Sequence, residues 1–163
     1  MALEAIPGSV STPGNLRIAF VPSGDPLSVA VLVANTTKDL TYSLTPDGFN
    51  RTMGQDTIDD PRLTLVQKLS KPGGVTETLE LTWVYGADDD VAKTALAANT
   101  TGFIIARYAI PNETAWTAAQ IVDKLTIQAG QPRKNAPADN GVFTATQTIF
   151  LTAPTEYDAV LVA

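Results

Sequence analysis

The stretch PRLTLVQKLSKPGGVTETLELTWVY, residues 61–85, alternates between apolar and polar side chains on both sides of a short interruption. Successive side chains of a strand point to opposite faces, so this alternation is typical of strands with one buried and one solvated face. The interruption, Lys71-Pro72-Gly73-Gly74, combines a proline of restricted φ with two glycines that tolerate positive φ. We therefore predict a long hairpin, with strands at 62–70 and 74–85 joined by a turn at 71–74.

Other alternating or continuously apolar runs recur along the chain, bounded by glycine, proline, aspartate or asparagine. They predict further strands at 15–22, 40–44, 102–110, 120–128, 142–152 and 157–163. We expect a turn at 45–48 and a loop at 131–141, where proline, glycine and charged residues gather. Residues 27–34 are ambiguous, because Asp25-Pro26 favours a helix start whereas the alternating valines favour a strand; we favour a short helix.

Residues 88–98 carry the strongest helical pattern in the chain. Three aspartates at 88–90 precede an alanine-rich run, and acidic residues in a first turn complement the helix dipole. The same aspartates lack the glycine and the closing glutamate of an EF-hand calcium loop, so we interpret them as a helix start. The predicted fold class is therefore mainly β: an antiparallel β-sandwich or barrel with one flanking α-helix at about 88–98.

The 163 residues suffice for one domain with a hydrophobic core. Residues 1–14 carry two prolines and two glycines without periodicity, so we expect a flexible N-terminal arm at 1–14 and a single domain at 15–163. No basic segment followed by an apolar one opens the chain, and its apolar runs fall far short of the ~20 residues of a membrane helix. We expect a soluble cytoplasmic protein without membrane insertion.

The charge and the residue types that are absent exclude several kinds of function. A net charge of −6 argues against a protein that grips nucleic acid, because lysine and arginine drive that binding. The chain contains neither cysteine nor histidine, which excludes disulfides, a cysteine nucleophile and a Ser-His-Asp triad. A phosphate-binding loop is also missing. We therefore expect no catalytic residue, no cofactor and no metal, and hence no enzyme.

Several segments together resemble the major tail tube proteins of long-tailed, siphovirus-type phages of actinobacteria. They are residues 44–49, 59–63, 73–85, 102–108 and 133–139 and the strand that contains Gln147. The resemblance extends over most of the chain from about residue 26, and the order and spacing of these segments carry it. Where that family often has a Cys-Gly pair, this chain has Ala129-Gly130.

The resemblance implies a β-sandwich subunit with a flanking helix, acting as a structural virion protein. Six copies would form a ring, and stacked rings would form the hollow tail tube for genome delivery. It also implies tape-measure, tail terminator and baseplate proteins as partners, and DNA that passes through without specific binding. The implied location is the host cytoplasm during assembly and the virion tail afterwards.

The polar positions of the predicted strands are the candidate functional surface. Sheets that join edge to edge around a ring would lose their exposed edges, and a wall that passes DNA needs polar side chains that do not hold phosphates. We therefore expect one face of the 62–70/74–85 hairpin or of the 142–152 strand to line the lumen or to contact neighbouring subunits. The candidates are Thr64, Lys68, Thr76, Thr78, Glu80, Thr82, Thr144, Thr146 and Thr148.

Two unpatterned segments, the arm at 1–14 and the loop at 45–61, are candidates for contacts between rings. Trp83 is expected in the core, and Trp116 is expected to be exposed at an interface. Three alternatives remain open: an adhesive or head-decoration β-sandwich protein without tube assembly, a ligand-binding barrel or enzyme, and a tube protein of a secretion system.

Overall fold

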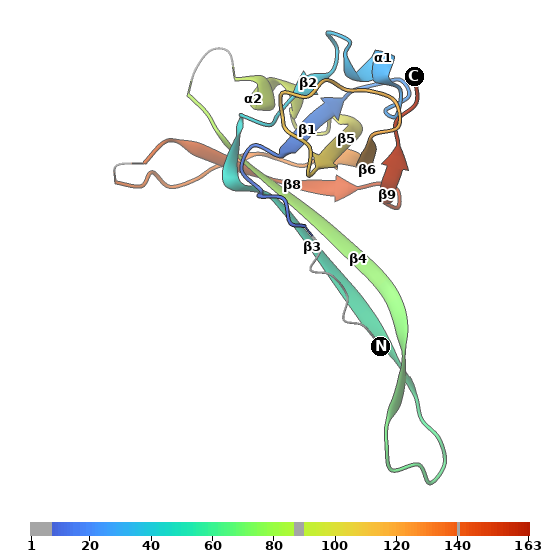
Figure 1. The fold of residues 1–163 in the computed structure, drawn as a ribbon. Helices are drawn as coiled ribbons and strands as arrows, with labels where there is room; N and C mark the ends of the chain where they lie inside the picture. Colours follow the sequence, from blue (N-terminus) through green and yellow to red (C-terminus); the bar gives the residue numbers. More distant parts are fainter. Residues whose placement is uncertain (1–7, 87–89, 140) are drawn as a thin grey trace.

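The computed structural model describes residues 8–86, 90–139 and 141–163 and consists mainly of antiparallel strands (Figure 1). The strands are β1 (Leu16–Val21), β2 (Lys38–Asp39), β3 (Leu44–Asp60), β4 (Leu69–Val84), β5 (Thr101–Tyr108), β6 (Ile121–Ala129), β7 (Arg133–Lys134), β8 (Thr144–Leu151) and β9 (Glu156–Val160). The helices are α1 (Val29–Leu32) and α2 (Val91–Ala95). The predicted fold class, mainly β and antiparallel, is confirmed.

The described strands belong to one sheet that folds over on itself. Its order is β2-β1-β5-β6-β8-β4-β3, with β7 paired to β8 and β9 paired to β6. One edge of β6 pairs with β5, and its other edge pairs with β9 near the start of the strand and with β8 near its end. The sheet divides at this point, so its two halves can face each other across a core.

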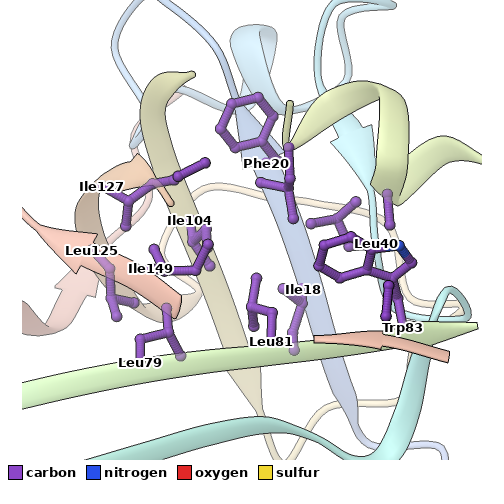
Figure 2. Packing of buried hydrophobic residues seen from close by; sticks show 14 residues of the cluster. Ile18, Phe20, Leu40, Leu79, Leu81, Trp83, Ile104, Leu125, Ile127 and Ile149 are labelled. Carbon is purple, nitrogen blue, oxygen red and sulfur yellow. The ribbon is translucent and has the colours of Figure 1, made fainter. Parts of the chain in front are cut away.

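The main core lies between these two halves (Figure 2). Side chains of β1, β5 and β6 meet side chains of β4 and β8, and Trp83 is buried among them as predicted. The buried members are Ile18, Phe20, Leu40, Leu79, Leu81, Trp83, Ala92, Leu96, Ile104, Leu125, Ile127, Ala129, Ala145 and Ile149. At roughly 1.5–3 kcal/mol for each large side chain taken out of water, this core dominates the stability of the fold.

A second, smaller core covers the opposite face of β1 and β5. Ala19, Val21 and Ile105 pack there with Leu32 of α1 and with Leu161 near the end of the chain. Both faces of these central strands are therefore buried, which is why their sequences are continuously apolar and not alternating.

The hairpin of β3 and β4 is longer than predicted, and its loop lies elsewhere. The outermost pair joins Asp60 to Leu69, so residues 61–68 form the loop, and the predicted strand at 62–70 and turn at 71–74 are wrong. Gly73 and Gly74 lie inside β4, where the two residues face the single residue Asp56 as a β-bulge. Glycine is typical of bulges as well as of turns, so the sequence signal was real but had two structural solutions.

The predicted turn at 45–48 and strand at 40–44 also differ from the structure. Leu44 pairs with Trp83 and Phe49 pairs with Leu81, so residues 45–48 are a large bulge within β3 that faces Thr82. A Cβ on Gly48 would lie 2.1 Å from the carbonyl oxygen of Thr82, so only glycine allows this close approach. The expected strand at 40–44 is instead a turn between β2 and β3.

The helices form where the sequence indicated, with different caps and lengths. The short helix expected at 27–34 is confirmed as α1, although its N-cap is Ser28 and not Asp25. Asp90 caps α2 by accepting a hydrogen bond from the backbone N–H of Lys93 at 3.0 Å, and the helix ends well before residue 98. The other two aspartates of the predicted helix start, Asp88 and Asp89, lie outside the described residues.

The described part of the predicted arm, residues 8–14, is exposed, whereas residues 1–7 lie outside the described residues. In the part of the chain that the structure covers, no helix is long and apolar enough to cross a bilayer.

Candidate functional site

The threonine-rich face predicted from the sequence forms on the neighbouring strands β4 and β8. Thr82 lies opposite Thr146, and Glu80 lies opposite Thr148. These side chains alternate along β4 with Leu79 and the other core residues, so they point to the opposite face of the sheet. The structure thereby brings together Glu80, Thr82, Thr144, Thr146 and Thr148. Thr78, opposite Thr52, continues the same side of β4 just beyond the last pair with β8, and we call these six residues the threonine face.

The other three predicted residues lie away from this face. Thr76 is on the part of β4 that projects beyond the body, opposite Gly54. Thr64 and Lys68 are in the loop at 61–68, at the far end of the hairpin (Figure 1). The sequence placed them with the others because it assigned a strand to 62–70.

Part of the threonine face is closed by side chains of the 131–141 segment. Asn135 donates hydrogen bonds to the hydroxyls of Thr144 at 3.0 Å and Thr146 at 2.8 Å, and the hydroxyls of Thr146 and Thr82 lie 2.9 Å apart. Thr146 is only 6% exposed. Thr78, Glu80 and Thr148 remain exposed, and they are the members of the face that are available to solvent or a partner.

A charged cluster at the base of the hairpin was not identified from the sequence. Arg51 of β3 donates to Glu77 of β4 at 2.8 Å and to Asp123 of β6 at 2.7 Å. Its guanidinium also donates to the hydroxyl of Tyr108 at 3.2 Å. These ion pairs are largely shielded from solvent. One sign of the cluster is present in the sequence: Glu77 is charged at a position of β4 where the alternation predicts an apolar residue.

The second oxygen of Glu77 binds the segment that leads into and through β9. Thr155 donates to it at 2.6 Å, and the hydroxyl of Tyr157 donates to it at 3.2 Å. Arg51 also lies over the ring of Tyr157, 5.2 Å from its centre. We call Arg51, Glu77, Tyr108, Asp123, Thr155 and Tyr157 the hairpin-base cluster.

These contacts shift the ionisation of the cluster. Burial opposes the charge of Glu77, but hydrogen bonds from Thr155, Arg51 and Tyr157 outweigh it and lower the pKa of the carboxyl. Burial likewise opposes the charge of Arg51, but its hydrogen bonds to Asp123, Glu77 and Tyr108 outweigh this effect and raise the pKa of the guanidinium. Arg51 and Glu77 are therefore both charged at neutral pH and form an ion pair.

Trp116 is buried at 6% exposure, so the prediction that it is exposed at an interface is wrong. Two guanidinium groups lie over its ring, that of Arg107 at 4.6 Å and that of Arg17 at 4.9 Å from the ring centre. Arg107 is fully buried and donates to the backbone carbonyls of Pro111, Thr114 and Ala115. Burial and the nearby Arg17 lower the pKa of Arg107, and the group serves to hold the loop between β5 and β6.

The loop of the hairpin exposes an unusual amount of apolar surface. Leu63 is 95% exposed and Val66 is 99% exposed. Apolar neighbours with large exposed fractions are Ile58, Leu65 and Leu69. Exposed apolar groups that gather at one place mark a contact surface, and we call these five residues the hairpin tip.

The sheet also ends in an open edge. In the described residues β3 is the last strand of the order, and no other strand pairs with its outer edge. Native proteins rarely leave a strand of this length, 17 residues, open to pairing unless a partner covers it. Across the described ranges, no three carboxylates are placed to hold a metal ion together.

Comparison with known proteins agrees with this architecture. No curated protein matches the chain in sequence. A solved structure, the cryo-EM structure of the anti-feeding prophage baseplate (six-fold symmetrised), contains a chain with a similar fold: the TM-score is 0.54 at 10% sequence identity, and the match covers 96% of each chain. The family model described as phage tail tube protein matches residues 4–163, nearly the whole sequence. The chain therefore belongs to the phage tail tube protein family, a family of structural tail proteins and not of enzymes.

Proposed function

We propose that six copies of this chain form a ring and that stacked rings form the hollow tail tube of a long-tailed phage of actinobacteria. The observation that carries the proposal is the match of the tail tube family to residues 4–163. The similar chain in the baseplate structure comes from an assembly described with six-fold symmetry, which supports the ring number proposed here.

The open edge of β3 supports ring closure. A strand of a second copy that pairs with this edge would continue the sheet from one subunit to the next, and closure of the ring would leave no open edge. The same surface would otherwise be a site of uncontrolled aggregation, so an obligate partner explains why the edge is long and unprotected.

The threonine face supports the passage of DNA. Its exposed members, Thr78, Glu80 and Thr148, carry hydroxyls and one carboxylate. The exposed cation beside them is Arg133, which pairs with Thr146 at the margin of the face. A ring of six chains of charge −6 carries about −36 in total, so the mean field repels DNA. In this proposal the exposed members of the face line the lumen. Thr146 is buried and instead forms hydrogen bonds with Thr82 and Asn135 within the face.

The hairpin tip supports the contact between rings. β3 extends from Thr52 to Asp60 beyond Arg51, about 30 Å at roughly 3.3 Å per residue. The charges around the tip largely cancel, because Asp60 pairs with Arg62 at 2.9 Å and with Lys71 at 3.3 Å. The contact with a second copy therefore depends chiefly on the exposed apolar side chains of the hairpin tip.

The remaining partners follow from the same proposal. A tape-measure protein occupies the lumen during assembly in the host cytoplasm, and tail terminator and baseplate proteins bind the two ends of the tube. These contacts use the ring surfaces that a copy of this chain leaves free at each end.

Negative-stain electron microscopy of the purified chain over a range of concentrations tests the proposal. We expect rings or hollow rods whose length increases with concentration. An adhesive or head-decoration protein would give separate particles without a channel. Monomers at every concentration, including in the presence of tape-measure protein, would contradict the tube.

A further inference from the structure

The hairpin leaves the body of the protein at a single level. β4 pairs with β8 from Leu79 to Val84, and Leu79 lies opposite Arg51 of β3. Beyond this level the two strands pair only with each other, and Figure 1 shows them projecting away from the body. A two-stranded ribbon is marginally stable by itself and has no third strand to set its direction. Its direction must therefore be set at its base.

The hairpin-base cluster lies at this level. Arg51 is in the last pair that the body supports, and Glu77 is in the following pairs, opposite Met53. We consider the part of the hairpin that runs from Arg51 and Leu79 to the loop. Among its described residues, only Arg51 and Glu77 form side-chain hydrogen bonds to β5, β6 and the 155–157 segment. The charged groups are thus the main link between the ribbon and the body.

Apolar packing does not replace this link. Met53 and Val75, on the same side of the ribbon as the cluster, line an open hollow against Leu151 and Pro154. Both side chains are more than half exposed. The ribbon could therefore swing toward or away from this hollow without the loss of a packed core, if the charged contacts were absent.

The body side of the cluster is held in place independently of the hairpin. Asp123 accepts a hydrogen bond from the backbone N–H of Asp158 at 3.2 Å. Asp158 has a φ of 52°, a left-handed conformation that is unusual for a residue with a side chain, and it lies where the pairing of β9 with β6 is irregular. This hydrogen bond joins two residues of the body, so it orients Asp123 toward Arg51 without any contribution from the hairpin.

We propose that the hairpin-base cluster is a positioning site that sets the angle of the hairpin and so delivers the hairpin tip to a second copy of this chain. Arg51 joins the carboxylates of the ribbon and the body, and Tyr157 and Thr155 fix the second oxygen of Glu77. The partner in this inference rests on the proposed function; the positioning itself does not. If the cluster only stabilised the body, its loss would lower the free energy of unfolding and leave the angle of the hairpin unchanged.

The absence of cysteine allows a direct measurement of the angle. Cysteines introduced at Gln67, in the hairpin loop, and at Thr117, on the exposed surface of the body, would carry two spin labels. Double electron–electron resonance then gives the distribution of distances between the loop and the body. The parent protein is expected to give one narrow distribution.

Arg51→Met and Glu77→Gln are the test variants. Loss of charge-assisted hydrogen bonds should raise the population of displaced hairpins about tenfold and broaden the distribution, while the circular dichroism of the body is unchanged. Tyr157→Phe, which removes one hydrogen bond, should have a smaller effect in the same direction. Asp39→Asn, which breaks the ion pair of Arg17 with Asp39 in the body, is the matched control and should leave the distribution narrow.

Assembly is measured on the same variants by electron microscopy. A broadened distribution with shortened or absent tubes supports the proposal. A narrow distribution in both Arg51→Met and Glu77→Gln overturns it, and so does a broadened distribution with normal tubes, since the angle would then be irrelevant to assembly. If the parent protein forms no tubes, the proposed function fails, and the label distances still decide whether the cluster positions the hairpin.

Discussion

Removal of the apolar groups of the hairpin tip should prevent tube growth without affecting the fold. Leu63→Ala and Val66→Ala in one chain remove five carbons from side chains that are 95% and 99% exposed in the single subunit. These groups make no contribution to the core, so the free energy of unfolding should change by less than about 0.5 kcal/mol.

The effect on assembly follows from the area that a partner would cover. At about 0.8 kcal/mol for each buried CH₂ group, loss of the five carbons costs about 4 kcal/mol per contact if they are fully buried and about 2 kcal/mol if they are half buried. Each 1.4 kcal/mol is a factor of ten in an equilibrium constant, so the critical concentration for tubes should rise by about 30-fold to 1,000-fold.

Light scattering against protein concentration measures this threshold, and sedimentation separates tubes from subunits. Val33→Ala is the matched control, since Val33 is 62% exposed on the body and loses the same two carbons as Val66. An unchanged threshold in the double variant, with an intact fold, would refute the role of the hairpin tip in assembly. If Val33→Ala raised the threshold concentration equally, loss of exposed apolar surface at any position would weaken assembly, and the hairpin tip would have no special role.

Three further predictions concern the lumen, the bulge and the cluster. Thr148→Lys should leave tube assembly intact and slow genome ejection from particles, because a lysine on the wall binds phosphates; ejection at the normal rate would count against a lumen position. Gly48→Ala should lower the stability by about 1–3 kcal/mol in thermal unfolding, because its Cβ would lie 2.1 Å from the carbonyl oxygen of Thr82, whereas Gly8→Ala, with open space around it, should have little effect. Since the folded pKa of Glu77 is lowered, its contribution to stability should be complete above the ordinary glutamate pKa and disappear as the pH falls through the folded value. Unfolding measured against pH should show this loss in the parent protein and not in Glu77→Gln.

Much of the candidate surface could be derived from residue patterns. The alternation of residues 76–82 and 144–148 correctly indicated which side chains leave the core, because the period of two is a local property of an extended backbone. The same reasoning failed at residues 61–74. Gly73 and Gly74 suit a turn and a bulge equally, and the choice between them depended on 44–60 becoming the partner strand.

The hairpin-base cluster could not be derived in the same way. Arg51, Glu77 and Asp123 lie on three strands, and only Glu77 breaks its local pattern. Trp116 gave no local sign of burial, because the two arginines that lie over its ring come from β1 and β5. Contacts between residues so distant along the chain have no periodic signature.

The class of fold, the core-facing positions of most strands, the aspartate cap of α2 and the net acidic charge of the chain could be derived from the residues alone. These features follow from interactions between near neighbours in the chain and from total charge. Long-range contacts set where the hairpin closes, which groups hold it to the body and which edge of the sheet stays open in the described residues. Each of these depends on the pairing of distant strands, whose register is selected by the burial of the whole core and not by any one segment.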